Sequence, residues 1–138
     1  MKYSMTKRRI EEYASLRREI VMLGEQVDTA QRYGMEYLWD VVQASTGPGD
    51  QKRNIVVKGY GSRSIPKLLA LKAKKETECD AIEKYIEEVD DSVIRQILTR
   101  RYIEGRSIYE SAQLVGYSER QVKRIIKGFF ERMSTNSL

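Results

Sequence analysis

The chain has 138 residues, a formal net charge of +5, one cysteine and no histidine. That length allows one domain, or a small domain with an extension, because single hydrophobic cores typically use about 100 to 150 residues. The absence of histidine removes the usual general base and the commonest metal ligand, so we expect no enzyme, no catalytic residue and no metal or cofactor site. The single cysteine, Cys79, excludes an internal disulfide, and no apolar run exceeds four residues. We therefore expect a soluble cytoplasmic protein without a membrane span.

The first expected element is a long helix over about residues 4–44. Apolar residues recur there every three or four positions over four heptads, which indicates a seam that packs on another helix. The partner helix belongs either to the same chain or to a second copy, so a homodimer remains one of two arrangements. The seam consists of Tyr13, Leu16, Ile20, Leu23, Val27, Ala30, Gly34, Tyr37 and Val41.

Residues 45–64 break this pattern with glycines, a proline and several basic side chains. They predict a loop of about twenty residues, which is long for a compact domain. A short strand-like run, residues 55–57, lies inside it. The sequence Gly59-Tyr60-Gly61 lacks the lysine and hydroxyl residue of a nucleotide-binding loop, so we assign it to loop flexibility. The loop's net charge of +3 would allow contact with a DNA backbone, but a solvated tether is the simpler interpretation.

A second long helix is expected over residues 64–89, with Pro66 tolerated in its first turn. Its apolar face matches that of the first helix, which predicts an antiparallel helical hairpin over residues 1–90. The first helix is the longer one, so one of its ends must overhang, and we expect this to be its N-terminal end, with Tyr3, Met5 and Ile10 against the domain that begins where the second helix stops. The acidic residues after the second helix are better used to cap the next helix, through Asp90 or Asp91, than to hold a cation.

The remaining residues, 91–138, predict a domain of three helices. The first covers residues 92–103 and ends before Gly105. Its expected buried face consists of Val93, Ile94, Ile97 and Leu98.

Two capping boxes eleven residues apart then open two further helices. Ser107 is followed three residues later by Glu110, and Ser118 in the same way by Gln121. Gly116 falls where the chain must turn between them, because glycine enters the left-handed conformation without a Cβ clash. The pattern predicts an all-α fold, in which a long antiparallel hairpin precedes a C-terminal helix-turn-helix domain. The expected apolar wedge between the two helices is Val115, Tyr117, Val122 and Ile125, with the small Ala112 at their crossing.

The whole positive excess of the protein lies in this domain. Residues 92–138 contain nine Lys and Arg and four Asp and Glu, whereas residues 1–91 are balanced. Along the last helix, apolar residues at spacings of three and four form the expected buried stripe, namely Val122, Ile125, Ile126, Phe129, Phe130 and Met133. The cations left on the outer face are Arg120, Lys123, Arg124 and Lys127. Such a face predicts a polyanionic partner, and double-stranded DNA is the partner that suits a helix-turn-helix.

Residues 94–133, with the sequence IRQILTRRYIEGRSIYESAQLVGYSERQVKRIIKGFFERM, resemble the fourth conserved region of sigma-70 family factors. The residues that carry this likeness are Arg101-Tyr102, Gly105, Ser107, Ala112, Gly116 and residues 118–125. Over most of the chain, the order of long helix, basic glycine-rich loop, second long helix and sigma-like domain resembles phage and prophage transcription regulators of the RinA and ArpU type.

In sigma factors the start of the recognition helix contacts promoter bases, and the matching residues here are Glu119, Arg120, Lys123 and Arg124. Arginine can grip guanine bidentately and glutamate can accept a hydrogen bond from cytosine N4. Contacts to the DNA backbone are then expected from Ser118, Lys127, Arg106 and Arg101. Ser111 departs from the family, which usually has an aliphatic residue there. The regions that bind the polymerase core or melt DNA have no room in this chain, so a complete sigma factor is not expected.

The leading hypothesis is a sequence-specific, phage-derived transcription regulator that binds double-stranded DNA and acts with host RNA polymerase. The alternative is the DNA-recognition subunit of a phage packaging machine, since small terminase subunits also join a helix-turn-helix to helical oligomerisation elements. A third reading, a coiled-coil interaction protein with an incidental basic tail, leaves the two capping boxes around Gly116 unexplained.

Overall fold

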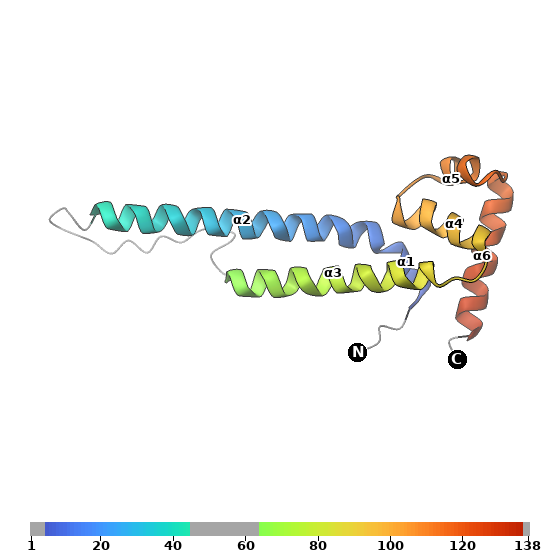
Figure 1. Cartoon of the computed structure of the whole chain (residues 1–138), viewed down its shortest axis with the longest axis horizontal. Coiled ribbons are helices and arrows are strands. Elements are labelled where there is room, and N and C mark those ends of the chain that lie inside the picture. Colours follow the sequence, from blue (N-terminus) through green and yellow to red (C-terminus); the bar gives the residue numbers. More distant parts are fainter. Residues whose placement is uncertain (1–4, 45–63, 137–138) are drawn as a thin grey trace. The chain divides into compact units, whose positions relative to one another are not determined.

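A computed structural model of the chain describes residues 5–44 and 64–136, and the side chains of all these except residues 34–44 and 136. All regular structure within these ranges is helical, which confirms the all-α prediction (Figure 1). The elements in chain order are α1 (Lys7–Glu11), α2 (Tyr13–Ala44), α3 (Ile65–Glu87), α4 (Ser92–Leu98), the π-helical turn η1 (Thr99–Ile103), α5 (Ile108–Val115) and α6 (Glu119–Asn136).

The predicted first helix is divided into two at Glu12. Thr6 begins α1, because its hydroxyl accepts a hydrogen bond from the backbone N–H of Arg9 at 3.2 Å. Glu12 then adopts φ −78° and ψ −9°, and its N–H is shared between the carbonyls of Arg8 and Arg9. The break separates a five-residue helix from α2, so the continuous helix expected from the heptad pattern is wrong at this point.

The chain forms two compact units, one of Met1–Arg18 with Glu76–Leu138 and the other of Glu19–Lys75. Their bounds differ from the domains expected at 1–90 and 91–138, because the start of α2 and the end of α3 cluster with the C-terminal helices. Most of the predicted loop, residues 45–63, lies outside the described residues, as does its strand-like run at 55–57.

In the second unit, α2 and α3 run antiparallel and bury an apolar cluster. Leu23 and Val27 of α2 pack with Leu68 of α3, and Leu23 is fully buried. Gly24 lies against the side chain of Lys72, whose Cε would be 3.7 Å from a Cβ at the glycine. The predicted pairing of the two long helices within one chain is therefore confirmed.

In the first unit, the start of α2 packs on the end of α3. Tyr13 is 5% exposed, and its burial, together with the Glu83 carboxylate that accepts a hydrogen bond from its hydroxyl, raises the pKa of Tyr13 to about 12. Cys79 is fully buried beside it, and burial raises the pKa of its thiol. The cysteine therefore acts as a small core hydrophobe, as the sequence predicts.

The C-terminal helices share one apolar core. Asp91 caps α4 by accepting hydrogen bonds from the N–H groups of Val93 and Ile94 at 2.9 and 3.1 Å, which confirms its predicted role. The expected helix over residues 92–103 is α-helical only to Leu98 and continues as η1. The core side chains Ile97, Leu98, Ala112 and Val122 are each at most 3% exposed. They come from α4, α5 and α6, so each of these helices packs on the other two.

The turn between α5 and α6 has the predicted chemistry. Ser107 and Glu110 form a complete capping box at the start of α5. Gly116 ends α5 in the left-handed conformation with φ 84°, and its N–H bonds the carbonyl of Ala112. Ser118 and Gln121 form the second box through backbone and side-chain bonds of 3.0 and 3.2 Å.

Two glycine-to-alanine substitutions test this turn with opposite signs. Gly116→Ala should destabilise the protein by about 1 kcal/mol, because alanine in the left-handed conformation is strained even where space is free. Gly128→Ala lies in the interior of α6, where alanine is the better helix former, and should stabilise the protein by up to about 1 kcal/mol. Urea unfolding of both variants measures the difference. Equal effects of the two substitutions would contradict the left-handed turn.

Candidate nucleic-acid interface

One face of α6 is fixed against the protein. Val122, Ile126 and Phe130 succeed one another at intervals of four residues and are 0%, 9% and 7% exposed. The other members of the predicted stripe, Ile125, Phe129 and Met133, are half-buried. A helix held along one apolar stripe cannot rotate about its axis, so the direction of its opposite face is set by packing.

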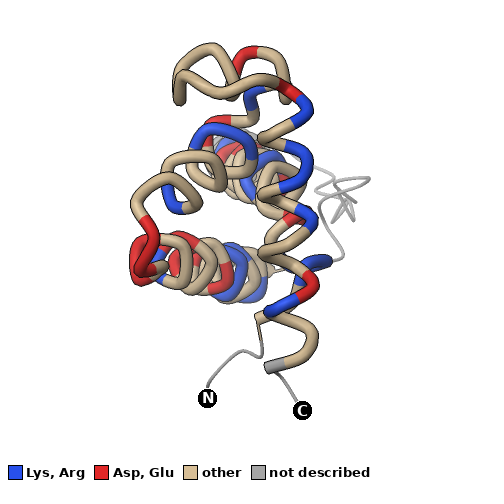
Figure 2. Tube along the Cα trace, turned by 90° about the vertical axis from the view of Figure 1, so that its right-hand side faces the viewer, with Lys and Arg blue, Asp and Glu red and all other residues tan. Residues whose placement is uncertain are grey.

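The opposite face carries the cations. Arg120, Lys123, Arg124 and Lys127 are all exposed, as is Glu119 at the start of the helix. At roughly 100° per residue the four cations share an arc of about 100°, which excludes the positions of the three most buried side chains, and Glu119 lies about 40° beyond the edge of that arc. Figure 2 shows Lys and Arg recurring along α6, the helix that leads to the C-terminus. This five-residue set is called the reading face below.

The four reading-face cations have no acidic partner among the described residues, since no ion pair or hydrogen bond joins any of them to a carboxylate there. They repel one another across one helix face. Their charges are therefore available to a polyanion, which would release condensed counterions on binding.

Arg106 and Arg101, which were expected to contact the DNA backbone, both form hydrogen bonds within the protein. Arg106 Nε donates to Glu104 Oε1 at 2.6 Å, and a second guanidinium nitrogen lies 3.7 Å from Glu110. Arg101 donates to the carbonyl oxygen of Arg106 at 2.9 Å, and its guanidinium lies 5.8 Å from the ring centre of Tyr102. Both arginines thus stabilise the segment between η1 and α5.

The hydroxyl of Ser118 also has a hydrogen-bond partner within the protein. Its hydroxyl accepts from the N–H of Gln121 at 3.2 Å and lies 3.1 Å from Gln121 Oε1, to which it donates. Its first role is to begin α6. The eight predicted site residues therefore fall into five on the open reading face and three with intramolecular partners.

The predicted wedge between α5 and α6 is smaller than expected. Val122 is fully buried, but Tyr117 is 38% exposed, and its assignment to the wedge is wrong because Gly116 turns the chain outward before it. Ser111 is fully buried, and none of the described groups forms a hydrogen bond with its hydroxyl. This serine is thus a core residue of the domain.

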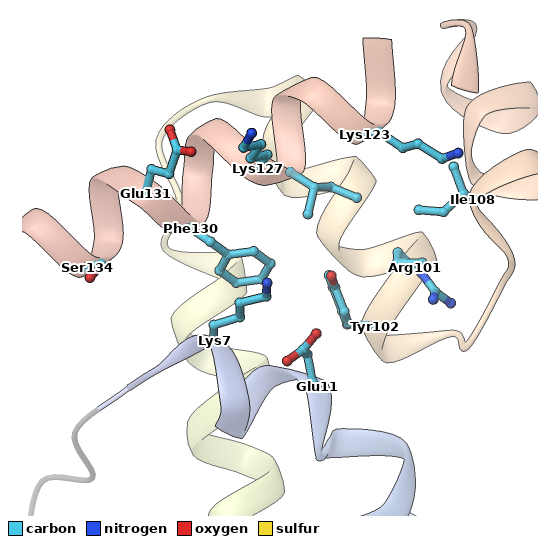
Figure 3. Close-up of a pocket in the computed structure, with 11 residues that line it drawn as sticks. Lys7, Glu11, Arg101, Tyr102, Ile108, Lys123, Lys127, Phe130, Glu131 and Ser134 are labelled. Carbon is cyan, nitrogen blue, oxygen red and sulfur yellow. The ribbon is translucent and has the colours of Figure 1, made fainter. Parts of the chain in front are cut away.

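Sequence reasoning missed Lys7 of α1. Its ammonium lies 5.5 Å from the ring centre of Phe130, on the buried side of α6 (Figure 3). Ile10 of the same short helix is fully buried, and the contact of Lys7 with Phe130 confirms the prediction that this end packs on the C-terminal helices. Met5 is half-buried, and Tyr3 lies outside the described residues. The only signal in the sequence was a run of three cations, residues 7–9, before an apolar residue.

Over residues 5–44 and 64–136 no group of three potential metal ligands comes together. No helix described there is long and apolar enough to cross a membrane. Comparison with protein-family models, with curated proteins and with solved structures gives no match.

Glu104 pairs with Arg100 and Arg106, and Arg106 also pairs with Glu110, in a network between η1 and α5. The pKa of Glu104 gives a test of this network. Hydrogen bonds donated by Arg106 and Arg100 hold this pKa below its ordinary value of 4.5. The folded state therefore favours the charged carboxylate, so the network's contribution to stability is complete above pH 4.5 and is lost as the pH falls through the lowered pKa. Arg106→Ala should return the pKa of Glu104 toward 4.5, as measured by NMR titration of its carboxyl carbon.

The matched control is Arg120→Ala, which removes an arginine that makes no contact with Glu104. It should leave that titration unchanged. A Glu104 pKa that is the same in Arg106→Ala as in the parent protein would contradict the network.

Proposed function

We propose that this protein is a sequence-specific double-stranded DNA-binding regulator of transcription. The observation that carries the proposal is the reading face, on which four exposed cations without acidic partners lie opposite a buried apolar stripe. A helix presented in this way, after a short helix and a glycine turn, has the dimensions and charge to enter a major groove about 12 Å wide.

The proposed roles follow from side-chain chemistry and from position along α6. Arg120 and Arg124 lie in its first two turns and can each grip guanine O6 and N7. Lys123 shares that face, and Glu119 can accept a hydrogen bond from cytosine N4. Lys127, one turn further on, contacts phosphate, where charge matters more than shape.

Regulation of transcription is proposed from the resemblance to sigma region 4 and to phage regulators of the RinA and ArpU type. On this proposal the protein brings host RNA polymerase to a phage promoter, which it selects by sequence-specific DNA binding. A single module of this size binds its site weakly, so contact with polymerase or a second copy would add the missing affinity.

Two substitutions on α6 distinguish binding that depends on base sequence from binding that depends only on charge. Arg120→Ala should cost about 1 to 3 kcal/mol on the preferred site and little on random DNA. Lys127→Ala should weaken binding to all sequences alike and reduce the salt dependence by about one unit. Fluorescence anisotropy on duplexes selected from a random pool, at several salt concentrations, measures both. Losses of the same size on selected and random DNA for both variants would contradict sequence-specific reading.

Transcription in vitro distinguishes regulation from DNA packaging. With host polymerase and a phage template, the protein should change initiation at one promoter, whereas Arg120→Ala should have little effect there. Binding near a packaging site by a ring-shaped oligomer, with transcription unchanged, would instead support the packaging alternative.

A further inference from the structure

An open pocket of about 480 Å³ lies along α6 between Lys123 and Ser134. It is formed by α1, by η1 with the start of α5, and by α6 (Figure 3). All of these elements belong to the first compact unit. Its apolar floor consists of Tyr102, Ile108, Ile126 and Phe130.

Helix α1 forms one wall of the pocket and packs on the unit. Ile10 buries α1 in the unit, and the ammonium of Lys7 is attracted to the face of Phe130. Phe130 in turn meets Tyr102 edge to face, with the ring centres 5.9 Å apart. The ammonium of Lys7, an exposed residue, thus lies near Phe130 and has no carboxylate partner among the residues that the structure describes.

Positive charge exceeds negative charge in the pocket lining. Lys7, Arg101, Lys123 and Lys127 contribute four cations, and Glu11 and Glu131 contribute two carboxylates. In the described part of the chain no ion pair joins any of the four to either carboxylate. The pocket therefore favours a small anion whose neighbouring groups can rest on an apolar floor.

The pocket adjoins the reading face. Lys123 and Lys127 belong both to the reading face and to the pocket lining. The 18 residues of α6 span about 27 Å, and the reading face occupies only the first half of the helix, so the C-terminal half of α6 extends past the residues proposed to read bases.

We propose that this pocket binds a backbone phosphate of the duplex that α6 reads, with Lys7 of the N-terminal helix as its cation and the deoxyribose against the apolar floor. This inference rests on the proposed function and extends the interface to a segment more than 90 residues away in sequence. A phosphodiester suits the site better than an acidic peptide, because Lys123 and Lys127 join the pocket to the helix face that is proposed to bind DNA.

The test compares two neighbouring cations on α1. Lys7→Ala removes the pocket cation, whereas Arg8→Ala removes one whose side chain is 90% exposed and pairs with Glu12 outside the pocket. Lys7→Ala should weaken binding of a random-sequence duplex roughly three- to tenfold and lower the salt slope by about 0.9. Arg8→Ala should change the affinity less than about twofold, because an exposed, distant charge is screened by salt.

Two further variants guard against a trivial folding effect. Lys7→Arg keeps the charge and should retain near-parental affinity, and Glu11→Gln removes a carboxylate from the pocket and should strengthen binding. Thermal melting of each variant establishes that the unit is folded. If Lys7→Ala is unfolded, Glu11→Gln still decides, since unchanged or weaker binding would overturn the phosphate site.

The outcomes separate this inference from the function on which it rests. If the parent protein binds no duplex, the proposed function fails. If the parent binds duplex DNA and Arg120→Ala loses the preferred site, but Lys7→Ala and Arg8→Ala have equal affinities and salt slopes, only the phosphate site fails. Weaker capture of an acidic peptide by Lys7→Ala, with DNA affinity unchanged, would also overturn it.

Discussion

The burial of one stripe of α6 is the constraint on which the candidate interface depends. Val122 is fully enclosed, and Phe130 meets Tyr102 of η1. Large apolar side chains of this kind each contribute about 1.5 to 3 kcal/mol when removed from water. Because that gain is available in only one rotation of the helix, the same packing that stabilises the domain directs Arg120 and Arg124 outward.

The turn before α6 sets where the helix begins. Gly116 reverses the chain in a conformation that costs other residues about 1 to 2 kcal/mol, and the Ser118 cap starts the next helix two residues later. Caps satisfy N–H groups that would otherwise lack a partner. A shift of one residue in this start would rotate the cations by about 100°, so turn chemistry and charge placement are coupled.

Local signals predicted much of this structure from the sequence. Capping boxes, the turn glycine and the apolar stripe of α6 each depend on residues within a few positions of one another, and all were confirmed. The break at Glu12 was not predicted, because glutamate is a good helix former and the apolar residues Ile10 and Tyr13 keep a helical spacing across it. Lys7 was missed for a related reason, since its contact with Phe130 joins residues far apart in sequence and follows no local pattern.

The acidic residues of the C-terminal domain explain why its cations are divided in two classes. Glu104 lies before α5 and Glu110 lies within it, and both pair with Arg106, which stabilises the segment that leads into α5. Glu119 stands at the start of α6, where negative charge is favoured by the helix dipole. No acidic residue then occurs in the sequence until Glu131. The middle of α6 thus keeps its positive charge uncompensated at a cost in self-repulsion, and a polyanion that relieves this repulsion gains binding free energy from it.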